Sequence, residues 1–181
     1  MRPLWTALIL AAAVSGAQAQ PAQKQVDGWF ADLAKAESAE DAQPIEEKIE
    51  AAFRQSGSPS VDLLMSRAKE SVSGGDSKTA STIVTAVNKL APAYAEGWRL
   101  RAMLDAASGE DSAAMLALQK VITLNPRHFG AMTELAGMLE DYGDKAGALK
   151  LYRQVQSLSP RNEAAANRIR ALSREVEGQG I

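Results

Sequence analysis

Apolar residues recur at helical spacing in two segments that follow the first twenty residues. The first segment predicts a helix over residues 25–37, and its apolar positions are Trp29, Phe30, Leu33 and Ala34. The second predicts a helix with Pro44 in its first turn, a position that proline tolerates. The apolar stripe of this second helix consists of Ile45, Ile49, Ala52 and Phe53. Residues 38–41 are expected to break the chain between the two helices, so together they predict a helical hairpin.

From Val61 to Asn162 the pattern repeats with a period of 34 residues, in blocks that start at Val61, Ala95 and Phe129. Six positions are identical in all three blocks. Positions 8, 15 and 20 hold Ala68, Ala102 and Ala136, then Gly75, Gly109 and Gly143, then Ala80, Ala114 and Ala148. Positions 27, 30 and 32 hold Val87, Val121 and Val155, then Leu90, Leu124 and Leu158, then Pro92, Pro126 and Pro160.

Each repeated position has a physical reason in a pair of antiparallel helices. The glycine ends a first helix, because it adopts a left-handed conformation without steric cost. The acidic residue that follows it (Asp76, Glu110 or Asp144) favours the start of a second helix, by capping or through the helix dipole. The alanines allow close helix approach, the valine and leucine are expected to be core, and the proline ends the second helix. Each block is therefore predicted to be helix, turn, helix, turn.

These positions resemble the tetratricopeptide repeat (TPR) family, whose period, small residues, glycine and proline they match. Trp98 and Tyr152 occupy two of the positions where that family has large residues. The match departs at position 7, with Arg67 and Arg101, and at position 11. The resemblance implies an all-α fold, a right-handed α-solenoid of antiparallel helix pairs. The whole chain resembles the short exported TPR proteins of Gram-negative bacteria.

The predicted organisation has nine helices and no strand. Residues 1–19 are a signal peptide, 20–60 a degenerate hairpin that caps the stack, 61–94, 95–128 and 129–162 the three repeats, and 163–181 a capping helix and tail. Terminal repeats of solenoids are commonly atypical, because they cover the last apolar face. In the final helix Ala166, Ile169, Ala171 and Leu172 are expected to face inward.

The first residues have the three parts of a secretory signal peptide: a basic start at Arg2, an apolar run from Leu4 to Val14, and Ala17-Gln18-Ala19. The apolar run is about half the ~20 residues that a membrane span needs. We therefore expect cleavage after Ala19 and a periplasmic protein, with secretion as the alternative. With no cysteine and no second apolar stretch, we expect neither a lipid anchor nor stable membrane insertion.

Composition excludes several classes of function. The chain has no cysteine, one histidine and a net charge of −2, which argue against thiol chemistry, multi-histidine metal sites and nucleic-acid binding. His128 is expected at a helix start or on the surface, with ligand contact or pH sensing as the alternative. Glu46, Glu47 and Glu50 are expected to form a solvated acidic helix face. We predict no catalytic residue, no cofactor and no metal.

The resemblance implies that the first helices of the repeats line a concave surface that binds a protein or peptide partner of unknown identity. The candidate contacts are Met65, Lys69, Arg99, Met103, Thr133 and Glu140. A carboxylate-binding groove would need Asn and Lys at positions 5 and 9, and Met65 and Lys69 supply only the second. The predicted function is a non-enzymatic scaffold or adaptor in the cell envelope. The alternatives are a self-associating structural protein and an accessory subunit of an envelope enzyme complex, and the oligomeric state is left open.

Overall fold

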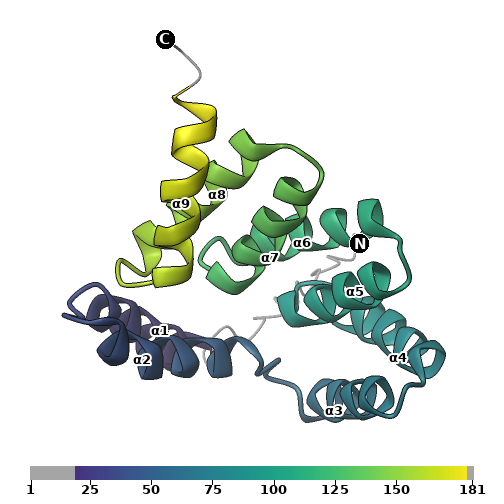
Figure 1. Cartoon of the computed structure of the whole chain (residues 1–181). Coiled ribbons are helices and arrows are strands. Elements are labelled where there is room, and N and C mark those ends of the chain that lie inside the picture. Colours follow the sequence, from purple (N-terminus) through teal and green to yellow (C-terminus); the bar gives the residue numbers. More distant parts are fainter. Residues whose placement is uncertain (1–18, 179–181) are drawn as a thin grey trace, which may run out of the picture.

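The computed structural model describes residues 19–178, and this part of the chain consists of helices without any strand (Figure 1). The elements are α1 (Ala19–Leu33), α2 (Ala39–Phe53), α3 (Pro59–Ser73), α4 (Ser77–Leu90), α5 (Ala95–Ala107), α6 (Asp111–Leu124), α7 (Phe129–Asp141), α8 (Lys145–Leu158) and α9 (Glu163–Val176). The predicted all-α solenoid is confirmed. The predicted signal peptide lies outside the described residues, except for Ala19. Within the described range, no helix is both long and apolar enough to cross a bilayer.

Helix pairs form where the repeated glycine and acidic residue stand together. Gly75, Gly109 and Gly143 have φ angles of 80°, 77° and 84°, the left-handed conformation expected of them. Asp76 and Asp144 then cap α4 and α8, because each side chain accepts a hydrogen bond of 2.9 Å from a backbone N–H three residues on. Side-chain capping is therefore confirmed in two of the three repeats.

The repeated small residues form the helix–helix contacts of the array. All six alanines at positions 8 and 20 and all three valines at position 27 are at most 2% exposed. The leucine of position 30 does not follow the prediction throughout, since Leu90 is 69% exposed. Leu90 and Leu158 each end the second helix of their block, but only Leu158 packs against the apolar cluster that contains side chains of the N-terminal hairpin.

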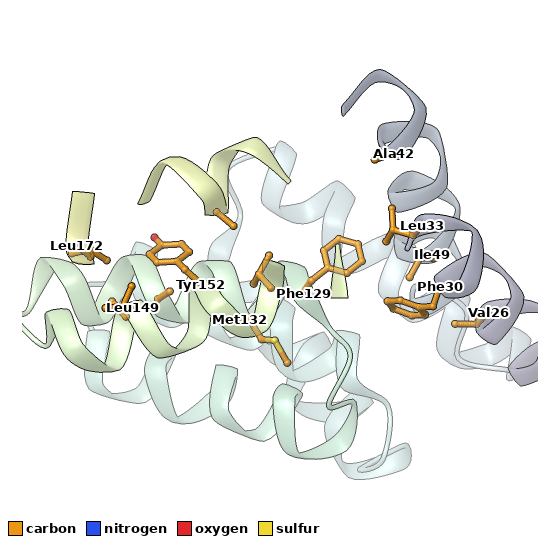
Figure 2. Close-up of a cluster of buried hydrophobic side chains, with 14 residues drawn as sticks. Val26, Phe30, Leu33, Ala42, Ile49, Phe129, Met132, Leu149, Tyr152 and Leu172 are labelled. Carbon is orange, nitrogen blue, oxygen red and sulfur yellow. The ribbon is translucent and has the colours of Figure 1, made fainter. Parts of the chain in front are cut away.

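The N-terminal hairpin lies elsewhere than predicted. It does not stack on α3 and α4 but lies beside the C-terminal repeats, where Phe30 and Ile49 share one apolar cluster with Phe129 (Figures 1 and 2). The rings of Phe30 and Phe129 meet edge to face, with centroids 6.4 Å apart. Arg127 adds an ion pair of 2.6 Å to Asp27 and lies over the Phe30 ring. The apolar stripe thus covers the start of α7 instead of the end of the stack.

The second helix of the hairpin begins earlier than predicted. Ser38 caps α2 by accepting a hydrogen bond of 3.1 Å from the backbone N–H of Asp41. The segment expected to be a break is therefore the cap and first turn of α2, and Pro44 lies in its second turn. Pro44 has no N–H to give to the carbonyl of Glu40, but both residues are exposed, so water can satisfy that carbonyl.

Candidate functional site

A groove with a volume of about 540 Å³ runs across the first helices of the repeats, between α3, α5 and α7. Its apolar lining consists of Leu100, Ala102, Met103, Ala106, Leu118 and Met138. Its charged lining consists of Lys69, Glu96, Arg99, Glu134 and Asp141. Met103 is 47% exposed, although Leu100, Ala102 and Leu118 of the same apolar lining are buried. A concave, largely apolar surface with a few charged groups is suited to holding another molecule.

Three of the six predicted contact residues line this groove: Lys69, Arg99 and Met103. The other three have partners within the chain. Met65 is buried in the core of α3 and α4, Thr133 donates a hydrogen bond of 2.9 Å to the carbonyl of Phe129, and Glu140 accepts one of 3.1 Å from Arg168 of α9.

Sequence reasoning missed five lining residues: Leu100, Ala102, Leu118, Glu134 and Met138. Leu118 comes from α6, the second helix of its block, where no groove contact was expected. Leu100 and Glu134 stand at block position 6 and Met138 at position 10, next to the positions expected to face the groove. Because a helix presents a stripe about 100° wide, these adjoining positions belong to the same face.

Arg99 is surrounded by carboxylates from three helices. Its guanidinium lies 2.8 Å from Glu50 of α2, 2.6 Å from Glu134 of α7 and 3.5 Å from Glu96 of α5. Burial alone would lower the pKa of Arg99, but the hydrogen bond to Glu134 and the nearby carboxylates raise it above its usual range. The guanidinium is therefore a fixed positive charge whose donors are largely occupied.

His128 is completely buried beneath this cluster. Its Nδ1 accepts a hydrogen bond of 3.4 Å from the backbone N–H of Ala131, so His128 is the N-cap of α7. The ring proton therefore sits on Nε2, which donates to Glu96 across 2.7 Å. The predicted helix-start position is confirmed, and the predicted surface position is wrong because Phe53 of α2 covers the ring, with centroids 5.0 Å apart.

Glu96 keeps its negative charge despite its burial. Desolvation would raise its pKa, but the hydrogen bond from His128 and the charge of Arg99 together hold that pKa below the usual value. The carboxylates of Glu50 and Glu96 and the imidazole of His128 lie close enough to hold a metal ion. Arg99 already supplies a cation to both carboxylates, however, which makes the cluster a poor match for a second one.

Helix α2 crosses the turns between the repeats. Glu46, Glu50 and the C-cap residue Arg54 stand one helical turn apart. Each meets the residue that precedes the first helix of a repeat or the final helix. Glu46 accepts a hydrogen bond of 3.1 Å from Asn162, Glu50 lies 3.7 Å from His128, and the carbonyl of Arg54 accepts one of 2.6 Å from Tyr94. Successive block ends (94, 128 and 162) therefore contact successive turns of α2.

The predicted solvated acidic face is correct for one of its three residues. Glu47 is exposed, whereas Glu46 and Glu50 are half-buried and bonded to the repeats. This docking brings a carboxylate of the hairpin to Arg99 at the margin of the groove. Because the imidazole of His128 is fully buried, it cannot touch a molecule bound in the groove.

Comparisons with known proteins agree with this architecture, although no family model matches the chain. A TPR repeat-containing protein of Rhizobium etli is 27% identical over 162 residues, covering 90% of this chain and 79% of that protein. A crystal structure of MamA superposes with a TM-score of 0.58 at 23% identity, covering 77% of this chain and 84% of MamA.

Two similar structures contain a bound peptide. The first TPR of Spaghetti (RPAP3), bound to the HSP90 peptide SRMEEVD, has a TM-score of 0.58 at 19% identity and covers 65% of this chain and 93% of its own. The Yersinia enterocolitica type III secretion chaperone SycD, in complex with a peptide of the translocator YopD, has a TM-score of 0.59 at 15% identity. That match covers 65% of this chain and 95% of the SycD chain. At these identities the likeness is one of fold.

Proposed function

We propose that this chain, which is a tetratricopeptide repeat protein, is a non-enzymatic module that binds a peptide or protein segment in the groove between α3, α5 and α7. The observation that carries the proposal is the groove itself, in which the half-exposed residue Met103 lies among apolar neighbours and charged groups. Methionine adapts to irregular partners. The peptides bound to Spaghetti and SycD support the same use of the fold.

We place this binding in the bacterial cell envelope, on the strength of the signal-peptide pattern in the first nineteen residues. Export is tested by N-terminal sequencing of the protein from a periplasmic extract, which should begin at Gln20. A protein that begins at Met1 and fractionates with the cytoplasm would contradict the location and leave the groove unaffected.

Site-specific photo-crosslinking tests the groove directly. A photoreactive amino acid replaces Met103 in the groove or, as the matched control, Leu116, which is 65% exposed on α6 and outside the groove. We expect a discrete crosslinked partner at position 103 that is missing at position 116, and mass spectrometry would identify it. Identical crosslinking patterns at both positions would overturn the proposal.

Self-association is the alternative favoured by a separate observation. Two large apolar side chains of the first repeat, on which the hairpin does not stack, are exposed: Leu63 at 55% and Leu90 at 69%. Exposed apolar surface of this kind can mark an interface between copies. Sedimentation of wild type and a Leu63→Ser, Leu90→Ser variant separates the two functions, since an oligomer that dissociates only in the variant would favour self-association.

A further inference from the structure

Carboxylates outnumber basic groups along the groove. Lys69 and Arg99 are its basic lining residues, whereas Glu96, Glu134 and Asp141 are acidic, and Glu50 of the docked hairpin adds a fourth carboxylate beside Arg99. Charge complementarity governs which partners such a surface accepts. The excess of negative charge therefore favours a partner that carries positive charge.

The guanidinium of Arg99 is not available to an acidic partner. Arg99 is only 25% exposed and already pairs with carboxylates from α2, α5 and α7. An incoming carboxylate would have to displace one of these and would meet the repulsion of the other two. Lys69, on the opposite wall, is the remaining basic lining residue.

The acidic groups of α7, by contrast, retain acceptors that face the groove. Both hydrogen bonds that Arg99 gives to Glu134 end on Oε1, at 2.9 and 2.6 Å, so Oε2 keeps its lone pairs. The side chain of Glu134 is 43% exposed, and Asp141 is exposed as well. These two residues stand seven positions apart, which is about 10.5 Å along one face of the helix.

We propose that the groove selects a segment in which lysine or arginine flanks an apolar side chain. The apolar side chain rests on Met103 and Met138, and the cationic groups reach Glu134 and Asp141 on the wall formed by α7. On an extended segment, side chains two residues apart share a face at a spacing of about 6.8 Å, and the long lysine or arginine side chains span the remaining distance between the two carboxylates. This inference rests on the proposed function, since it names the class of segment that the same groove binds.

Selection from a library of random displayed dodecapeptides tests the inference and does not require the natural partner. The full mature chain is the bait, and a Met103→Asp variant is used in parallel to subtract sequences that bind outside the groove. We expect the Met103-dependent sequences to be enriched in lysine and arginine beside leucine, methionine or phenylalanine. Their binding should weaken as salt is raised from about 50 to about 500 mM, because salt screens charge pairs.

A charge-removing variant then assigns the preference to α7. Glu134→Gln with Asp141→Asn should weaken binding of a selected basic peptide about fivefold, because the variant removes two partly exposed charge pairs and each contributes up to about fivefold. The matched control removes two exposed carboxylates away from the groove, Glu110→Gln with Glu163→Gln, and should change affinity less than about twofold. Asp141→Asn alone leaves the Arg99 cluster intact, so it reports on charge even if the double variant is unstable.

The outcomes separate this inference from the proposed function. Met103-dependent peptides that are neutral or acidic, or that bind the α7 variant and the control equally, would overturn the basic preference and leave the groove as the binding site. If no selected peptide depends on Met103, the proposed function fails, and the inference fails with it.

Discussion

The carboxylate of Glu50 in α2 lies 2.8 Å from the guanidinium of Arg99 in α5, although 49 positions separate them in the chain. Their contact shows that the N-terminal hairpin is docked on the side of the array, where the groove meets the turns between repeats. Truncating the hairpin would therefore leave Arg99 with one carboxylate fewer and would uncover Phe129, while α3 would lose little. The hairpin is part of the site as well as of the fold.

The first prediction tests this docking through stability. Phe30→Ala should lower the free energy of unfolding by about 3 kcal/mol, because a buried aromatic ring leaves a cavity between α1 and α7. Leu63→Ala in α3 is the control and should cost less than about 1 kcal/mol, since Leu63 is 55% exposed. Urea unfolding followed by circular dichroism measures both. A larger loss for Leu63→Ala would instead favour a hairpin stacked on α3.

The repeats could be predicted from the sequence because each repeated residue acts within its own block. Gly75 ends α3, and Ala80 of α4 packs against α3, which ends only a few residues earlier in the chain. The hairpin could not be placed in this way, because the stripe that holds Phe30 predicts burial without naming a partner. Its partner Phe129 lies about a hundred positions along the chain, and no repeated spacing links the two.

The site was predictable to the extent that helix register determines it. Lys69, Arg99 and Met103 stand at groove positions on the first helices of two successive repeats and do line the groove. Met65 stands at the position equivalent to Arg99 but is 3% exposed, because it packs in the apolar cluster that α3 forms with α4 and α5. The burial of His128 could not be predicted from the repeats, because the same block position holds Tyr94 and Asn162, which differ from it chemically. The three residues share a role only in the structure, where each contacts α2 or its C-cap.

The second prediction tests the close contact of helices at position 20. Ala114→Glu should unfold the chain or cost at least about 4 kcal/mol, because Ala114 is completely buried and an unpaired charge cannot be solvated there. Ala86→Glu in α4 changes an alanine outside the buried core and should cost less than about 0.5 kcal/mol. Thermal melts that coincide for the two variants would mean that position 20 is not a contact position.

The third prediction concerns two glycines of opposite conformation. Gly109→Ala should destabilise the chain by about 1 kcal/mol, because φ is 77° at the end of α5 and a side chain is strained there. Gly28→Ala lies within helix α1 with no atom within 4 Å of the added carbon, and should stabilise by about 0.5–1 kcal/mol. Chemical denaturation of both variants measures the two changes, and equal signs would contradict the assignment.

The fourth prediction is a pH dependence that arises from Glu96. Its pKa in the folded chain is lower than the usual value of 4.5, because the hydrogen bond from His128 and the charge of Arg99 outweigh burial. The folded chain therefore binds this proton less readily than the unfolded chain, so ionised Glu96 stabilises the fold above about pH 4.5. That contribution should be lost as the pH falls through the lower, folded pKa.

Comparison with Glu96→Gln isolates this contribution. At pH 7 the variant should be less stable than wild type by about 1.5–3 kcal/mol, the range of a hydrogen bond to a charged group. The difference should shrink as the pH is lowered from about 5 to about 3, because only wild type loses a charge at position 96. Glu110→Gln, which removes an exposed carboxylate that makes no side-chain cap bond, should keep a nearly constant difference from wild type over the same range.

Urea unfolding at each pH measures the free energy of unfolding of wild type and of the two variants. A gap between wild type and Glu96→Gln that stays constant or widens toward the acid end would show that Glu96 is not held ionised by His128 and Arg99.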